Sequence, residues 1–225
     1  MGSIMRKELR FGLLGLFMLT SLTRSSPGAA EPTRVACVGD SITYGSGLER
    51  RDRESYPAVL ARLLGAAFEV RNFGVSGATL LRRGDLPYGD LPEFGAATAF
   101  DPHIVILMLG TNDTKGQNWR HRAEFAGDLA ALIDHFAALP SRPRVWVCLP
   151  PPLFGLLRAH GNSVLDGGVI PLTARIAREK DVPVIDVNAA LAGRGDCFPD
   201  GVHPDAAGSA AIAEAVFRAV QKQVE

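Results

Sequence analysis

The sequence lacks an excess of charge of either sign. Its 225 residues include 24 Lys and Arg against 24 Asp and Glu, so the formal net charge is zero. A nucleic-acid-binding domain needs a basic face, and this balance argues against nucleic acid as a partner. Only three cysteines are present, and none belongs to a Cys-x-x-Cys pair. A disulfide scaffold and a cysteine zinc site are therefore excluded.

Histidine is equally sparse. Of the five histidines, His103, His121, His135 and His160 are scattered and form no His-Glu-x-x-His motif. Without metal-ligand spacing, these four are expected to be surface or structural residues. The sequence therefore calls for no metal and no cofactor.

A hydrophobic run long enough to span a bilayer is also missing. The N-terminal run from Phe11 to Leu22 has 12 residues and follows three basic residues, whereas a span needs about 20 residues. Gly28 and Ala30 stand at the −3 and −1 positions of a cleavage site. Residues 1–30 are predicted to be a secretory signal peptide, with an uncleaved anchor as the alternative. The protein is then expected to be exported and free of the membrane. Cleavage would remove four basic residues and one acidic residue, so the mature chain is expected to carry a net charge of −3.

The remaining 195 residues alternate between two kinds of pattern. Short, continuously apolar runs rich in β-branched residues predict strands that are buried on both faces, as in a parallel sheet. These runs are Val35–Val38, Phe68–Phe73, Ile104–Leu109, Val145–Leu149 and Val182–Val187. Helical stripes lie between and after them, at Tyr56–Leu64, Phe125–Phe136, Leu172–Ile176 and Ile212–Val220. The alternation predicts one α/β domain, residues 31–225, with helices on both faces of a parallel sheet.

Residues suited to catalysis follow the ends of these strands. The first strand leads into Ser41, the second into Gly74 and the third into Asn112, while Asp200 and His203 lie in a loop after the fifth. In open parallel sheets the functional groups gather at the carboxyl ends of the strands. These five residues are therefore expected to meet at one edge of the sheet.

Together they are the groups that acyl transfer requires. A serine hydroxyl needs a base within hydrogen-bond reach, and His203 is suited to remove the proton of Ser41. The Asp200 carboxylate, three residues before the histidine, is placed to orient the imidazole. The backbone N–H groups of Ser41 and Gly74 and the amide of Asn112 are predicted to form the oxyanion hole.

The four segments that carry these residues resemble the SGNH hydrolases, also called the GDSL esterase/lipase family. The family's Ser, Gly, Asn and His blocks fall on Ser41, Gly74, Asn112 and His203, and its Asp-x-x-His pair falls on Asp200 and His203. The resemblance covers the whole mature chain and implies a flavodoxin-like sheet of order 2-1-3-4-5. The longer pattern GDSITYG, NFGVSGATL and FPDGVHP also looks like bacterial sialate O-acetylesterase-like carbohydrate esterases.

Two further segments point to a sugar ester as the substrate. Trp119 follows the Asn112 block, and Tyr88 lies after the second strand; both combine an aromatic ring with polar neighbours. Asp40 and Asp113, which flank catalytic positions, are further candidates for substrate contacts, although turn formation and capping explain both equally well. The predicted activity is removal of small acyl groups, mainly acetyl, from carbohydrate.

An apolar run after the fourth strand supports an alternative. Residues 150–157, Pro-Pro-Pro-Leu-Phe-Gly-Leu-Leu, are suited to line an acyl-chain groove. A lysophospholipase, an arylesterase or an acyl-thioesterase would use the same catalytic residues. A non-catalytic carbohydrate-binding module is the alternative from another class.

A last hypothesis concerns a disulfide between Cys148 and Cys197. Both residues are expected at the same edge of the sheet, and export would favour a disulfide between them.

Overall fold

Five parallel strands form one sheet in the order β2-β1-β3-β4-β5. The computed structural model describes residues 31–155 and 163–221. The strands are β1 (Thr33–Gly39), β2 (Phe68–Gly74), β3 (Ile104–Met108), β4 (Arg144–Leu149) and β5 (Val184–Asp186). The predicted strand order is confirmed. The predicted signal peptide, residues 1–30, lies outside the described residues and stays a prediction.

Alternate residues of the central strands pack into two different cores, which confirms the expected burial of both sheet faces. In β1, Ala36 and Val38 belong to one cluster, whereas Val35 and Cys37 belong to the other. All four are fully buried. Because side chains of a strand alternate between its faces, a strand covered on both sides is apolar throughout.

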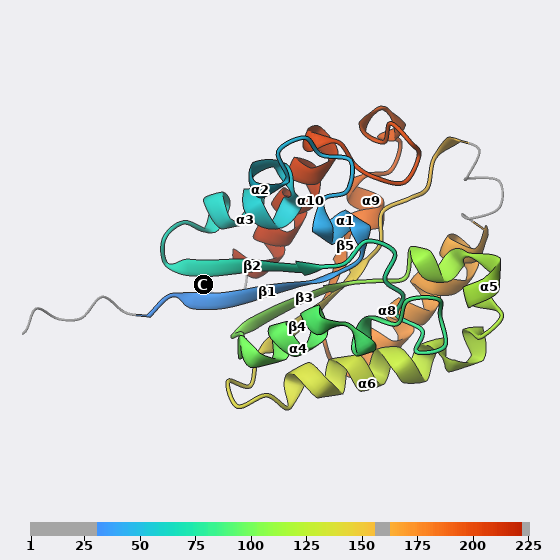
Figure 1. Ribbon diagram of the computed structural model, residues 1–225, viewed down its shortest axis with the longest axis horizontal. Coiled ribbons are helices and arrows are strands. Elements are labelled where there is room, and N and C mark those ends of the chain that lie inside the picture. Colours follow the sequence, from blue (N-terminus) through green and yellow to red (C-terminus); the bar gives the residue numbers. More distant parts are fainter. Residues whose placement is uncertain (1–30, 156–162, 222–225) are drawn as a thin grey trace, which may run out of the picture. The chain divides into compact units, whose positions relative to one another are not determined.

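Helices cover each face of the sheet (Figure 1). One layer contains α3 (Tyr56–Leu64) and α10 (Ala206–Gln221), with α2 (Arg51–Glu54) beside them. The other layer contains α4 (Pro92–Ala99), α6 (Phe125–Ala137) and α8 (Ile170–Glu179). Short helices follow the strand ends: α1 (Ser41–Tyr44), α5 (Gly116–Trp119) and α9 (Val187–Ala190). Among the residues described, no helix has the length and apolar character needed to cross a membrane.

The structure departs from the expected elements in two places. The fifth strand pairs over three residues only, because Val182 ends the preceding turn with a hydrogen bond to the Ala177 carbonyl and Val187 begins α9. Helix α4, which connects β2 to β3, carries no clear apolar stripe: its eight residues include three alanines and Gly95, and only Ala97 is buried.

The hypothesis of a disulfide between Cys148 and Cys197 is wrong. All three cysteines are free and buried. Cys148 lies in the apolar cluster beneath α10, where burial raises the pKa of its thiol. Cys197 accepts a hydrogen bond from the Arg194 guanidinium at 3.1 Å. The two thiols are thus packing residues of the core.

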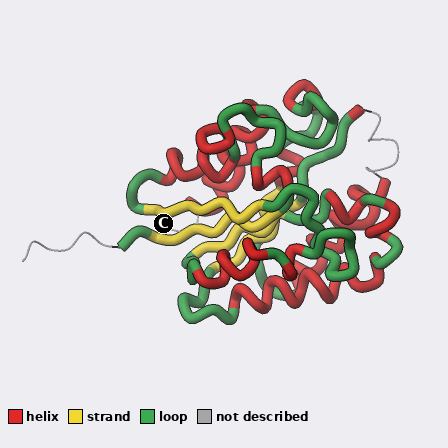
Figure 2. Tube along the Cα trace, in the orientation of Figure 1, coloured by secondary structure: helices red, strands yellow, loops and turns green. Residues whose placement is uncertain are grey.

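Loops that follow the strands gather at one end of the sheet (Figure 2). In parallel strands this end is the carboxyl edge, where α1, the turn after β2 and the turn after β3 meet. The fold therefore brings the predicted catalytic segments together.

Candidate active site

Ser41 occupies the first turn of α1, directly after β1. The Asp40 side chain caps this helix, because its Oδ1 accepts a hydrogen bond from the Ile42 N–H at 2.9 Å. Gly39 has no room for a side chain, since a Cβ there would lie 2.1 Å from Thr43 Oγ1. This tight connection between strand and helix holds Ser41 in place, and 5% of its surface remains exposed.

Ser41, His203 and Asp200 form one continuous hydrogen-bonded chain. The Ser41 hydroxyl lies 2.9 Å from His203 Nε2, and His203 Nδ1 lies 2.6 Å from Asp200 Oδ2. A neutral imidazole with its proton on Nδ1 donates to the carboxylate and accepts from the serine. This arrangement is the one in which a histidine removes a serine proton.

The Asp200 carboxylate is fixed by its own loop as well as by the histidine. Its Oδ1 accepts hydrogen bonds from the backbone N–H groups of Val202 at 2.9 Å and His203 at 2.8 Å. Partial burial raises the pKa of Asp200, but the hydrogen bonds from the His203 ring and the two backbone donors outweigh it and bring the pKa to about 2. The carboxylate therefore stays ionised at neutral pH.

Part of the apolar run after β4 supports this loop. Phe154 N–H donates to the Gly201 carbonyl at 2.8 Å, and the Phe154 ring packs on Phe198 with centroids 4.8 Å apart. Gly201 has a positive φ of 83°, and a Cβ there would lie 2.6 Å from the Phe154 carbonyl. Phe154 thus packs against the catalytic loop. Residues 156 and 157, the end of the run, lie outside the described residues.

Two of the three predicted oxyanion donors retain a hydrogen that is not engaged within the described residues. Ser41 N–H belongs to the first turn of α1, where backbone donors have no partner within the helix. Asn112 begins a 3-10 turn after β3 and is 8% exposed. Its Nδ2 donates one hydrogen to the Ala78 carbonyl at 3.1 Å. The second hydrogen of that amide remains for a substrate oxygen.

The third predicted donor, Gly74, is already engaged. Its N–H donates to Asn72 Oδ1 at 2.9 Å, within β2. A Cβ at Gly74 would lie 2.3 Å from the Tyr44 nitrogen, so glycine is needed here for the close packing of β2 on α1. Gly77, three residues later, has a φ of 87°, and its N–H meets no acceptor among the described residues. Gly77 is the better donor.

A buried polar network joins the Asn112 turn to residues 78–85. The Asp113 carboxylate accepts the backbone N–H groups of Leu80 at 3.0 Å and Leu81 at 2.8 Å. Asn118, 1% exposed, binds both the main chain and the carboxylate of Asp85 at 2.9 Å, and its Nδ2 also donates to the Asn112 carbonyl at 2.9 Å. Sequence reasoning missed Asn118, because an asparagine in a polar segment gives no sign of burial.

Two buried carboxyl groups lie close to this site. The pKa of Asp40 is raised to about 7, mainly by burial and to a lesser degree by the nearby Asp113 carboxylate, against the lowering effect of the hydrogen bond from Ile42 N–H. Burial likewise raises the pKa of Asp113 to about 6, against the lowering effect of its two backbone donors. The second oxygen of Asp40 has no hydrogen bond of normal geometry within the described residues. Asp40 is thus the less well satisfied of the two.

Three of the four predicted substrate-contact residues are buried. Asp40 and Tyr88 are 1% exposed, and Asp113 is fully buried. Tyr88 donates its hydroxyl to the Phe73 carbonyl at 2.8 Å. Burial contradicts the expectation that Asp40 and Asp113 touch substrate, because they are used in capping and loop positioning. Tyr88 is a packing residue that also lines a cavity beside α4.

Trp119 is half-buried. Its ring packs edge-to-face on Phe125, with centroids 5.8 Å apart, and covers Gly168, where a Cβ would lie 2.3 Å from the indole. Gly168 belongs to a π-helical turn, Leu165–Val169. Packing explains this indole, and its contact with substrate stays a prediction.

The remaining histidines show structural contacts. His103 accepts the Arg34 N–H at 3.0 Å, and the His135 ring lies 2.8 Å from the Thr98 hydroxyl. His160 lies outside the described residues. Within residues 31–155 and 163–221, no three His, Cys, Asp or Glu side chains lie close enough to hold a metal ion.

Comparison with known proteins identifies the family. Residues 37–211 match the model of the GDSL-like lipase/acylhydrolase family. An acetylxylan esterase from Xylanibacter ruminicola is 35% identical over 217 residues, which are 88% of this chain and 45% of that protein. The chain thus spans about half the length of this curated relative.

Solved structures show the same fold. An aryl esterase from M. smegmatis superposes with a TM-score of 0.70 and 24% identity, covering 84% of this chain and 99% of that one. A carbohydrate acetylesterase from Sinorhizobium meliloti has a TM-score of 0.66 and 23% identity, with 84% and 98% covered. The family match extends over more than half of the sequence and includes Ser41, Asn112 and His203. The chain therefore belongs to the GDSL-like lipase/acylhydrolase family.

Proposed function

We propose that this protein is a serine esterase that hydrolyses small acyl esters of carbohydrate, above all acetyl esters. The observation that carries the proposal is the continuous chain from Asp200 through His203 to Ser41, with contacts of 2.6 and 2.9 Å. The similarity to an acetylxylan esterase supports an acetylated polysaccharide, such as acetylxylan, as the substrate.

In the proposed mechanism Ser41 attacks the ester carbonyl while His203 accepts the hydroxyl proton. Asp200 keeps the imidazole in the correct tautomer and stabilises its positive charge. His203 then gives the proton to the departing sugar hydroxyl, which leaves an acyl group on Ser41. A water molecule, deprotonated by His203, attacks this acyl-enzyme, and His203 returns the proton to Ser41 Oγ as the acid is released. Each step moves one proton between His203 and a reacting oxygen.

The negative charge of each tetrahedral intermediate needs fixed donors. We assign this role to Ser41 N–H, Gly77 N–H and the free hydrogen of Asn112 Nδ2. A crystal structure with a phosphonate attached to Ser41 tests the assignment. We expect the phosphonyl oxygen within about 3 Å of these three nitrogens. Contact with Gly74 N–H instead would restore the original assignment.

Export is part of the proposal and rests on residues 1–30 alone. Their basic, apolar and small-residue segments are typical of a cleaved signal. Amino-terminal sequencing of protein secreted from the native host tests this. A first residue near Glu31 is expected, whereas an intact N-terminus in a membrane fraction would indicate an anchor.

A panel of esters tests the substrate class. The protein is assayed on p-nitrophenyl esters from acetate to octanoate and on acetylated xylan, with Ser41→Ala as control. We expect the highest kcat/KM with acetate and acetic acid release from the polysaccharide. A preference for acyl chains of eight carbons or more would favour the lipase-like alternative. Glycan binding without any turnover would favour a non-catalytic module.

A further inference from the structure

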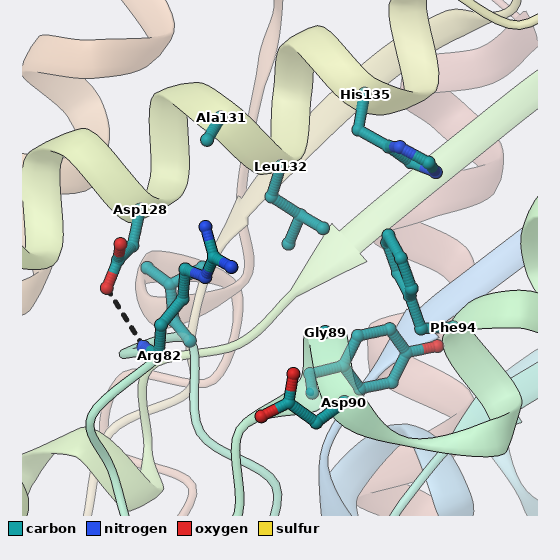
Figure 3. A pocket seen from close by; sticks show the side chains of 10 residues that line it. Arg82, Gly89, Asp90, Phe94, Asp128, Ala131, Leu132 and His135 are labelled. Atoms are coloured by element: carbon teal, nitrogen blue, oxygen red, sulfur yellow. Dashed lines mark hydrogen bonds between the residues drawn. The ribbon is translucent and has the colours of Figure 1, made fainter.

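A cavity of about 250 Å³ lies apart from Ser41 and His203, between α4, α6 and the segment that follows β2. Figure 3 shows the labelled side chains of Arg82, Asp90, Phe94, Leu132 and His135 around a common hollow. Pockets for drug-sized ligands measure roughly 300–1,000 Å³. This cavity therefore suits a smaller group, about one ring in size.

The charged groups of the cavity are not neutralised by one another. Asp128 accepts the Arg82 backbone N–H at 2.9 Å (Figure 3), but no ion pair joins the Arg82 guanidinium to a carboxylate among the described residues. Asp90 is exposed and also lacks an ion pair there. With one cation and two anions, the cavity carries a formal charge of −1. An anionic ligand is disfavoured, and hydroxyl donors find two carboxylates ready to accept.

The opposite wall combines apolar surface with a further acceptor. The Phe94 ring lies against His135 with centroids 4.5 Å apart, and Leu132 stands beside them. The Thr98 hydroxyl donates its one hydrogen to the Phe94 carbonyl at 2.9 Å. The same hydroxyl lies 2.8 Å from His135 Nε2, so it accepts there and His135 Nε2–H is the donor. His135 Nδ1 is then unprotonated and is an acceptor. Burial, which lowers the pKa of His135, favours the same neutral ring.

We propose that this cavity is a second carbohydrate site, which holds one neutral sugar residue of a polysaccharide while another residue is deacylated at Ser41. A sugar ring presents C–H groups that pack on Phe94 and Leu132, and hydroxyls that donate to Asp90 and Asp128 and accept from Arg82. A carboxylate ligand would meet two like charges, and for an ammonium ligand the Arg82 guanidinium offsets the attraction of one of the two carboxylates. A neutral polyhydroxylated ring satisfies every wall of the cavity.

The cavity and the oxyanion side of the active site share one segment. Leu80 lines the cavity. The backbone N–H groups of Leu80 and Leu81 donate to the Asp113 carboxylate. The carbonyl of Ala78, two residues before Leu80, accepts the hydrogen bond from Asn112 Nδ2. The polysaccharide ligand rests on the proposed function. The second site raises the local concentration of polymeric esters but does nothing for a single small ester.

Substitution of one exposed alanine tests the site. Ala131 lines the cavity from α6, and Ala131→Trp places an indole in it. Ala137→Trp, at the exposed end of the same helix, is the matched control. Unacetylated xylohexaose is titrated into both variants and the wild type by calorimetry. We expect saturable binding to the wild type and to Ala137→Trp, and at least a tenfold higher Kd for Ala131→Trp.

A kinetic measurement separates this inference from the proposed function. For each protein, kcat/KM on acetylated xylan is divided by kcat/KM on p-nitrophenyl acetate. This ratio should fall at least threefold in Ala131→Trp only, with thermal melts verifying that both variants are folded. Equal xylohexaose affinity in the two variants, or no binding to the wild type, overturns the second site. Failure to deacetylate xylan, with the binding difference intact, overturns the substrate assignment alone.

Discussion

The two halves of the candidate active site are built differently. Asp200 and His203 lie on an accessible loop, with side chains 56% and 29% exposed. Asn112, Asp113 and Asn118 are buried and bound to the main chain of residues 78–85. The proton-transfer half is thus open to solvent, whereas the oxyanion half is a closed polar network.

This difference matches the role that the proposed mechanism gives to each half. His203 must exchange protons with a leaving group and with water, so it needs access to both. Oxyanion donors act because they are fixed before charge develops, which requires that their supports do not move. Substitutions in the open half should therefore remove activity with little loss of stability, and substitutions in the closed half should affect both.

The largest effect is expected for His203 of the open half and for Ser41, the buried hydroxyl that it contacts. Ser41→Ala and His203→Ala should each lower kcat on p-nitrophenyl acetate by at least about 1,000-fold, because nucleophile and base act as a unit. Melting temperatures should change little, since neither side chain supports the apolar core. Calorimetry and steady-state kinetics provide the two readouts. Activity within tenfold of wild type would remove that residue from the mechanism.

Asn112→Ala tests the donor at the boundary of the two halves. Loss of one oxyanion donor costs about 100- to 1,000-fold in kcat. The Ala78 carbonyl also loses its partner, so a modest fall in stability should accompany the loss. KM should change little, because the donor acts on the charged intermediate. A kcat loss below threefold would exclude Asn112 from the oxyanion hole.

Asn118→Ala tests whether the closed network positions the oxyanion side. The substitution removes the Asn118 acceptor of the Asp85 N–H and the shorter of two hydrogen bonds to the Asn112 carbonyl, which keeps the 3.3 Å bond from Lys115 N–H. The loss should cost about 1–3 kcal/mol of unfolding free energy. We expect kcat to fall about tenfold with KM nearly unchanged. Gln117→Ala is the matched control, since its exposed amide makes only a 3.4 Å contact with Asp85. A stability loss with unchanged kcat would show a purely structural role.

The smallest effect concerns Asp40 and the pH dependence of stability. Because burial raises the pKa of Asp40 to about 7, the folded state holds its proton more tightly than the unfolded state does. Stability from this group is therefore lost as pH rises from about 4 to about 7. Asp40→Asn keeps the acceptor for Ile42 N–H and lacks the ionisation. The melting temperature of Asp40→Asn minus that of the wild type should therefore increase by a few degrees from pH 5 to pH 8. A difference that is the same at every pH would contradict the raised pKa of Asp40.

Much of the fold could be predicted because it depends on local patterns. The strands β1, β3 and β4 are largely apolar because both faces of the sheet are covered there, whereas the edge strand β2 includes Glu69, Arg71 and Asn72. The strand order follows from the family resemblance. Helix α4 escaped prediction because its alanines and Gly95 give no apolar stripe. The extent of β5 could not be predicted either, because Val182 and Val187 are apolar but bond to a turn and a helix.

Only some features of the candidate site could be predicted from the sequence. Ser41, Asn112, Asp200 and His203 could be found from sequence, because acyl transfer requires these residue types and parallel strands bring their ends together. The choice between Gly74 and Gly77 could not be made, since it depends on which N–H is already bonded. Tyr88 and Asp113 were predicted to touch substrate but are buried.

The sequence by itself determined the α/β architecture, the catalytic residue types and their order along the chain. Only the tertiary structure decided which polar groups are buried, which backbone donors remain free and that Cys148 and Cys197 stay unpaired. The physical reason is that apolar periodicity and required chemistry are recorded residue by residue. Burial and hydrogen-bond partners, in contrast, depend on contacts such as that between Asn118 and Asp85, 33 positions apart, which exist only once the chain is folded.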